Sequence, residues 1–251
     1  MIRVDGLTKV FQDKKRGAVR ALDGVSFEVN PREIVGILGP NGAGKTTALR
    51  LLATVLRPTS GTAEVAGYDV VRQPEMVRAH IGFLSGDMGL YGRLTPREIL
   101  TFFGRLAGMR PEALGKRVDD VIGMLGMASY AGTRTDKLST GMRQRAAIGR
   151  TIIHDPPILI LDEPSYGLDV PTARLIENFI LGARKNGKCI LFSTHVMEEA
   201  EYLCDRIVVV HEGRVRATGT MDDLRVLTGK TRLREIFLSL LGIEDVEEAR
   251  S

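Results

Sequence analysis

A glycine-rich segment at residues 39–47 carries the residue types that hold phosphate groups. It reads G-P-N-G-A-G-K-T-T and satisfies the spacing G-x-x-x-x-G-K-[ST]. Glycines let backbone N–H groups close around phosphate oxygens, and a following helix N-terminus adds unpaired donors and the positive end of its dipole. Lys45 would reach the β- and γ-phosphates of ATP, and the Thr46 hydroxyl would ligate Mg²⁺. The alternative is a glycine-rich turn that only caps a helix. The residues expected at the nucleotide are Gly39, Pro40, Asn41, Gly42, Ala43, Gly44, Lys45, Thr46 and Thr47.

Two adjacent acids, Asp162 and Glu163, end the apolar segment 158–161. Carboxylates at the C-terminal end of a parallel strand stand at the crevice where ligands bind. Asp162 could therefore hold Mg²⁺ through water beside Thr46, and Glu163 could orient or deprotonate an attacking water. The pair also suits an ordinary turn before Pro164, an interpretation that becomes the minor one beside a phosphate loop.

Two further residues stand where a segment begins or ends. His195 follows the apolar segment 189–192 and could bond a γ-phosphate and sense its loss, although a lone histidine is more often a cap or core residue. Ser139 is a favourable N-cap for a helix predicted to run to about residue 153. Helix N-termini attract anions, but taken alone the pattern is that of an ordinary capped helix.

The elements that must position these residues alternate between short apolar strands and helices. This alternation predicts a buried parallel sheet. Its strands are expected at residues 34–38, 158–161, 189–192 and 207–210. Residues 3–11, 25–29 and 62–67 read as further strands near the N-terminus, a helical pattern fills about 88–135, and residues 233–241 form one amphipathic helix.

Composition limits the classes of protein that fit. The chain has 251 residues, of which 43% are hydrophobic and 26% charged, so a single large α/β domain is expected. The net charge of +4 fits either an acidic partner, such as lipid headgroups or nucleic acid, or a mildly basic surface. There is no targeting run and no apolar stretch of about 18 residues, so a cytoplasmic protein acting at a membrane through a partner is expected.

Several segments, taken together in their order, resemble one family. They are the phosphate loop, L-S-T-G-M-R-Q-R at 138–145, I-L-I-L-D-E-P at 158–164, S-Y-G-L-D at 165–169 and S-T-H at 193–195. Over about residues 2–225 the chain resembles the nucleotide-binding subunits of ABC transporters. This implies an α/β P-loop NTPase core with a mostly parallel sheet, an N-terminal antiparallel β subdomain and an α-helical subdomain inserted at about 88–140. Residues 1–225 would form the nucleotide-binding domain and 226–251 a short helical tail.

The resemblance also implies partners. Two subunits would pair head to tail, so that Ser139 and Gly141 of one close on the γ-phosphate held by the other's phosphate loop. Phe11 would stack on adenine. From the residue pattern alone, Phe11 fits a core side chain at the end of a strand equally well. Lys45, Glu163 and His195 would be catalytic. The expected partners are a second ATPase subunit and an integral membrane permease on whose cytoplasmic side the chain would lie, with no nucleic acid.

The chain departs from the family pattern at several positions. Thr140 and Met142 replace a usual glycine and glutamine, Gly86 stands where a glutamine usually reaches Mg²⁺, and Tyr166 replaces a small residue. Asp87 could substitute as a water-mediated ligand. These variants leave open a module that binds ATP without splitting it.

The segment G-F-L-S-G-D-M-G-L-Y-G-R-L-T and the L-S-T-G-M sequence are similar to ATPase subunits of bacterial sodium-efflux exporters of the ABC-2 type. We therefore expect an ATPase that powers export, with Na⁺ as the candidate cargo. Alternatives are a drug, antibiotic or other small-molecule exporter and a non-transport ABC ATPase of DNA repair or translation.

Overall fold

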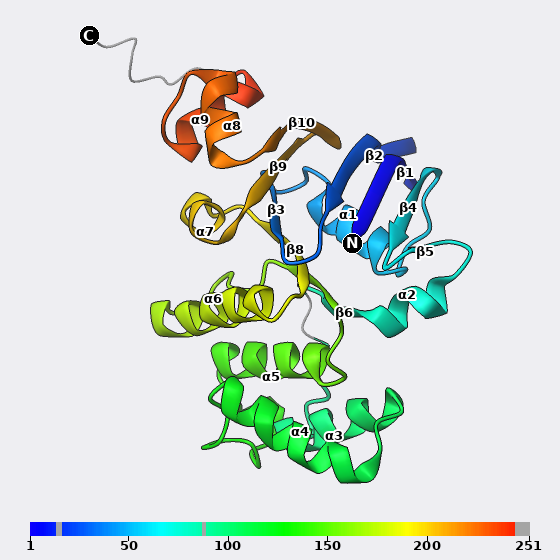
Figure 1. Ribbon diagram of the computed structural model, residues 1–251, viewed down its shortest axis with the longest axis vertical. Coiled ribbons are helices and arrows are strands. Elements are labelled where there is room, and N and C mark those ends of the chain that lie inside the picture. Colours follow the sequence, from blue (N-terminus) through cyan, green and yellow to red (C-terminus); the bar gives the residue numbers. More distant parts are fainter. Residues whose placement is uncertain (14–16, 87–88, 244–251) are drawn as a thin grey trace.

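The computed structural model describes residues 1–13, 17–86 and 89–243. Asp87, considered above as a substitute metal ligand, lies outside the described residues, as does the acidic segment 244–251. The described chain forms two sheets with helices around them (Figure 1).

The larger sheet has six strands in the order β10-β9-β3-β8-β7-β6. All neighbours pair in parallel except β9 and β10, which are antiparallel. As a result the carboxyl ends of β3, β7 and β8 meet at one edge, which confirms the predicted mostly parallel sheet. The strands are β3 (Ile34–Leu38), β6 (Ile81–Leu84), β7 (Ile158–Asp162), β8 (Cys189–Thr194), β9 (Arg206–His211) and β10 (Arg214–Gly219).

The smaller sheet is antiparallel and comes mostly from the N-terminal part of the chain. Its order is β2-β1-β4-β5, so the long first hairpin pairs with a strand that follows the phosphate loop. Alternating burial along β2 reflects the alternation of apolar and polar residues that predicted it. The strands are β1 (Ile2–Asp13), β2 (Gly17–Val29), β4 (Ser60–Val65) and β5 (Tyr68–Asp69).

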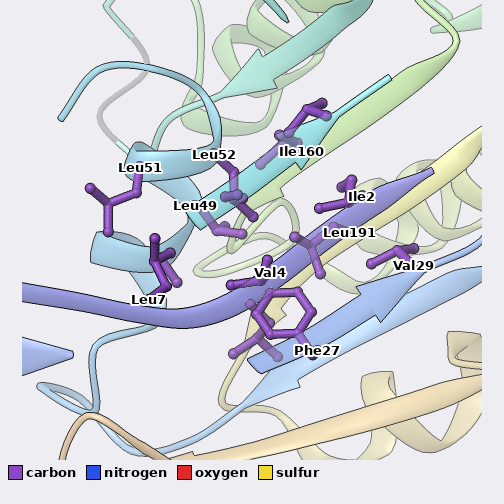
Figure 2. Close-up of a cluster of buried hydrophobic side chains, with 14 of the residues drawn as sticks. Ile2, Val4, Leu7, Phe27, Val29, Leu49, Leu51, Leu52, Ile160 and Leu191 are labelled. Carbon is purple, nitrogen blue, oxygen red and sulfur yellow. The ribbon is translucent and has the colours of Figure 1, made fainter. Parts of the chain in front are cut away.

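Helix α1 (Lys45–Leu52) packs between the two sheets and joins them through one core (Figure 2). Leu49 and Leu52 from this helix lie in the same cluster as Val4 of the small sheet and Leu191 of the large one. Each such side chain is fully or almost fully buried, and burying one contributes about 1.5–3 kcal/mol. The helix that carries the phosphate loop is therefore fixed from both sides.

Helices α3, α4 and α5 lie together at one end of the molecule, and α8 and α9 lie at the other (Figure 1). A second core cluster joins the first group to the parallel sheet and to α6. Thr95 caps α3 in a reciprocal capping box with Glu98. The helices of this region are α3 (Pro96–Leu106), α4 (Pro111–Met124), the short 3₁₀ turn Thr135–Lys137, α5 (Thr140–Ile152) and α6 (Val170–Lys185).

The last helix, α9, packs on the sheet rather than projecting from it. Leu233, Ile236 and Phe237 of α9 join Val209 and Leu38 in a third buried cluster. The remaining helices are α2 (Pro74–His80), α7 (Met197–Leu203), α8 (Met221–Thr228) and α9 (Leu233–Leu241). Within the ranges described, none of the helices combines the length and the apolar character needed to cross a bilayer.

Candidate nucleotide site

The phosphate loop runs from the end of β3 to the start of α1, and its shape requires glycine at two positions. A Cβ at Gly39 would lie 2.3 Å from the Val210 carbonyl oxygen, and Gly44 has a φ of 106°. No side chain caps α1, so the first amides of the helix remain open to an anion. A cavity of about 170 Å³ opens above the loop. Its walls include Pro40, Asn41, Gly42, Ala43, Gly44, Lys45, Thr46, Thr47 and Glu163.

Lys45 lies under this loop as a buried cation. Its Nζ donates hydrogen bonds to the carbonyl oxygens of Gly39, at 2.7 Å, and Pro40, at 3.2 Å. The same Nζ is 3.5 Å from Oε1 of Glu163. A buried ammonium requires such partners. Contacts within the chain alone therefore bring the predicted lysine and the predicted general base together.

Asp162 and Thr46 form an oxygen-rich pair beside the loop. The Thr46 hydroxyl donates to Oδ1 of Asp162 at 3.1 Å, and Ser193 donates to the same oxygen at 2.6 Å. Oxygen donors suit Mg²⁺. Neither here nor in the rest of the described residues does a group of three or more His, Cys, Asp or Glu side chains form that could hold a metal. Thr46 and Asp162 would therefore hold Mg²⁺ only together with phosphate oxygens or water, and the ion would neutralise phosphate charge.

Glu163 has an unusual backbone, with a φ of 47° at a residue that is not glycine. Its N–H donates to both the carbonyl oxygen and the hydroxyl of Ser193, at 3.2 and 3.0 Å. Ser193 thus fixes both acids. The sequence interpretation gave Ser193 no role, although its place at the end of the neighbouring parallel strand was the available signal. Asp162 and Ser193 are register partners of β7 and β8.

His195 completes the group. Its Nδ1 lies 3.2 Å from Oε2 of Glu163 but has no aligned hydrogen bond, and the ring of Tyr166 packs against it. His195 is not the cap of α7, since that position belongs to Val196. Lys45, Glu163 and His195 are therefore contiguous in space although they come from three parts of the chain.

The other predicted contacts lie elsewhere. Ser139 caps α5, accepting from the Met142 N–H at 3.3 Å, and a Cβ at Gly141 would lie 3.1 Å from the Thr172 side chain. Neither residue belongs to the walls of the phosphate cavity. Phe11 is 37% exposed on β1, so the alternative that it is a core side chain is wrong. The Lys9 ammonium lies 5.1 Å from its ring centroid.

A second cavity, of about 520 Å³, continues from the acid pair toward α5. Glu163, Thr140 and Tyr166 are among its walls. Gly86 lies at its edge, where a Cβ would be 3.5 Å from Oδ2 of Asp162. The departure at Gly86 therefore removes a side chain directly beside the proposed metal ligand. A larger cavity of about 820 Å³ lies against α6 and shares no wall residue with the phosphate loop.

Comparison with known proteins identifies the family. A family model described as "ABC transporter" matches residues 22–166. The ABC transporter ATP-binding protein NatA of Bacillus subtilis (strain 168) is 42% identical over 242 residues, which cover 96% of this chain and 98% of NatA. Daunorubicin resistance ATP-binding protein DrrA3 of Streptomyces coeruleorubidus is 40% identical over 232 residues, covering 92% and 72%.

A solved structure agrees with this match. It is a dimeric post-hydrolysis state of the ATP-binding cassette MJ0796 bound to ADP and Pi, and it superposes with a TM-score of 0.80 at 26% identity, covering 88% of this chain and 98% of that one. The phosphate loop, the acid pair and His195 thus lie in a fold shared with an ATP-hydrolysing cassette. The chain belongs to the family of ABC transporter ATP-binding proteins and is an ABC-type ATPase subunit.

Proposed function

We propose that two copies of this chain close head to tail around ATP and that their closure drives export through a separate membrane permease. One observation carries this proposal. Lys45, Glu163 and His195 gather at the phosphate cavity, whereas Ser139 and Gly141, at the start of α5, are not among its walls. Within one copy, the start of α5 reaches only the neighbouring 520 Å³ cavity, through Thr140, and Ser139 and Gly141 are not at the phosphate loop. A second copy would bring them there, as the dimeric form of the MJ0796 cassette suggests.

The chemistry of the closed site follows from the positions of the side chains. Glu163 directs a water molecule toward the γ-phosphorus and accepts its proton. The bond from that phosphorus to the β–γ bridging oxygen breaks, so that ADP and phosphate form, while Lys45 and His195 stabilise the charge on the phosphate oxygens. Thr46 and Asp162 would hold Mg²⁺, whose charge would neutralise the phosphates, and Phe11, exposed on β1, would stack on the adenine. Hydrolysis removes the γ-phosphate that bridges the copies, so the dimer opens again.

The proposed surface for the permease lies on α3 and the segment just before it. Tyr91, Phe102 and Leu106 are 56%, 48% and 71% exposed, and we call these three residues the docking surface. A groove of about 730 Å³ whose walls include Leu106 adjoins it. Leu90 and Leu94, which flank Tyr91 in the chain, are both partly buried, and Leu90 packs against the core, so neither belongs to this surface. Bound through this surface, the chain would be peripheral on the cytoplasmic face of the membrane.

Na⁺ is the proposed cargo. Its support is the likeness of the segments around Gly86 and Ser139 to sodium-efflux ATPase subunits, together with the match to NatA along nearly the whole of both chains. The second candidate is a drug, because DrrA3 is almost as similar over 92% of the chain. The ATPase subunit does not hold the cargo, so only transport itself separates these two.

The test uses sealed vesicles containing the chain together with its permease. ATP-dependent movement of radioactive Na⁺ and of daunorubicin is measured in parallel, with the Glu163→Gln variant as the inactive control. Na⁺ movement that disappears in the variant is the expected result. Movement of the drug without Na⁺ would show that the cargo is a drug, while the ATP-driven dimer would still stand as the source of power. ATP-dependent movement of neither would contradict an exporter of either class.

A further inference from the structure

Tyr166 has no part in the chemistry proposed above, yet it lies against a residue that does. Its ring and the imidazole of His195 have centroids 4.9 Å apart and planes inclined at 64°, an edge-to-face arrangement. Such contacts are attractive and depend on orientation. The pair therefore restrains the direction of the His195 ring as well as its position.

The tyrosine does not serve the hydrophobic core. It is 65% exposed, and together with Thr46, Asp162 and Glu163 it forms part of the wall of the 520 Å³ cavity. A side chain that is mostly in water gains little from burial. The contact of its ring with His195 therefore has to have a reason other than burial of the tyrosine.

The turn that carries Tyr166 is held at two points, and this aims the ring. The Tyr166 N–H donates to the carbonyl oxygen of Glu163 at 3.3 Å. One residue earlier, the Ser165 hydroxyl bonds to the buried carboxyl of Glu199 on α7. The turn is thus tied both to the candidate base and to the helix that follows His195.

The imidazole of His195 needs such a restraint. Its Nδ1 is buried and 3.2 Å from Oε2 of Glu163, but it forms no aligned hydrogen bond. A buried nitrogen without a partner is costly, and a small rotation of the ring would bring it into line with Glu163. With Tyr166 packed against the ring, large rotations away from Glu163 are opposed.

We infer that Tyr166 is a positioning residue for ATP hydrolysis, whose ring holds the His195 imidazole with Nδ1 beside Glu163. The inference rests on the roles proposed above for His195 and Glu163. Tyr166 acts through His195, and its hydroxyl group is not required, because the contact is made by the ring.

The test compares Tyr166→Ala with Tyr166→Phe in the full chain. Removing the ring is expected to lower kcat by roughly tenfold with little change in the KM for ATP, because misplacement of a catalytic group affects the chemical step more than binding. The phenylalanine variant should keep wild-type kcat. Tyr202→Ala is the matched control, since Tyr202 is also an exposed tyrosine, 46% exposed, but packs on Arg174.

Two further measurements separate the role inferred for Tyr166 from the roles proposed for His195 and Glu163. The NMR shifts of the His195 ring protons should move in Tyr166→Ala and not in Tyr202→Ala, because the neighbouring aromatic ring is lost. In a His195→Ala background, removal of the Tyr166 ring should cause no further loss.

If Tyr166→Ala keeps wild-type kcat while His195→Ala loses most of its activity, the inference about Tyr166 is wrong and the role of His195 stands. The same would follow from an undiminished effect of Tyr166→Ala in the His195→Ala background. Full activity of His195→Ala itself would instead overturn the role proposed for His195, and the inference with it.

Discussion

At the scale of single residues, Glu163 is the side chain whose environment says most about the reaction. One carboxylate oxygen lies 3.5 Å from the Lys45 ammonium and the other 3.2 Å from His195. Its left-handed backbone is held by Ser193. Strained backbone at a non-glycine residue persists only when its surroundings fix it. The direction of this carboxylate is thus set by the fold.

Replacing Glu163 with glutamine should separate binding from chemistry. The amide keeps the size of the side chain but cannot accept a proton, so we expect kcat to fall by roughly 10²- to 10⁴-fold. ATP affinity should be retained because the phosphate loop is unchanged. Phosphate release and equilibrium ATP binding measure the two effects. Glu198→Gln, at an exposed acid on α7, is the control and should keep wild-type turnover. Rapid turnover by Glu163→Gln would remove Glu163 from the role of base.

Residues inside a local motif were predictable, and residues defined by strand pairing were not. Lys45, Thr46, Asp162 and Glu163 were named from local motifs, and the fold brings their side chains together. The bridging role of Ser193 depends on the register of β7 against β8, which no spacing along the chain specifies. The Tyr166–His195 contact likewise requires the three-dimensional path of two loops.

At the scale of elements, burial determines which strands and helices could be predicted from the sequence. The parallel strands were found because they are continuous apolar runs, and β3, β7 and β8 are buried along their whole length. Helices α2 and α8 were not predicted. Each has one described residue fully buried, Val77 in α2 and Leu224 in α8, so neither can display a helical period of apolar residues. The capping box of Thr220 and Asp223 was the available signal for α8.

Helix α7 carries a buried acid whose ionisation should affect stability. Burial raises the pKa of the Glu199 carboxyl above its ordinary value of 4.5, although hydrogen bonds from Ser165 and Thr194 oppose the shift. A carboxyl whose pKa is higher in the folded than in the unfolded chain stabilises the fold fully below the unfolded value. That contribution is lost as the pH rises through the folded value.

Glu199→Gln should therefore become more stable relative to the wild type as the pH rises from about 4 to about 8. The amide is neutral throughout and can still accept a hydrogen bond from Ser165. Urea unfolding of both proteins across this range measures the difference in free energy. The exposed Glu198→Gln change should give no comparable trend. A difference that stays flat, or that favours the wild type at high pH, would contradict the buried-acid explanation.

At the scale of the whole molecule, the two halves of the proposed site belong to different regions of the chain. The phosphate loop leads into α1, which packs between the two sheets, whereas Ser139 caps α5, in the helical part at one end (Figure 1). Ser139 and Gly141 are missing from the walls of the phosphate cavity. A monomer therefore has a complete phosphate loop whose cavity Ser139 and Gly141 do not line, and in the proposed head-to-tail pair a second copy would bring them there.

The change Ser139→Asp tests this pairing without removing the cap. Aspartate is as good an N-cap as serine, so α5 should remain folded. In a closed dimer, however, its carboxylate would face the γ-phosphate held by the other copy. Like charges brought together cost several kcal/mol, so ATP-dependent dimerisation should weaken by roughly 10²-fold or more. The effect is measured in the Glu163→Gln background, where hydrolysis is blocked, by light scattering with ATP and Mg²⁺.

Thr220→Asp adds a carboxylate at the N-cap of α8, next to Asp223, and should leave dimerisation intact, since that helix lies at the opposite end of the molecule. If the Glu163→Gln chain stays monomeric with ATP and Mg²⁺, even beside its permease, the pairing itself is wrong. If it dimerises and Ser139→Asp dimerises equally well, the copies meet through another surface. Loss in Ser139→Asp with retention in Thr220→Asp would locate the start of α5 at the nucleotide of the partner copy, because the two variants differ in the position of the added charge.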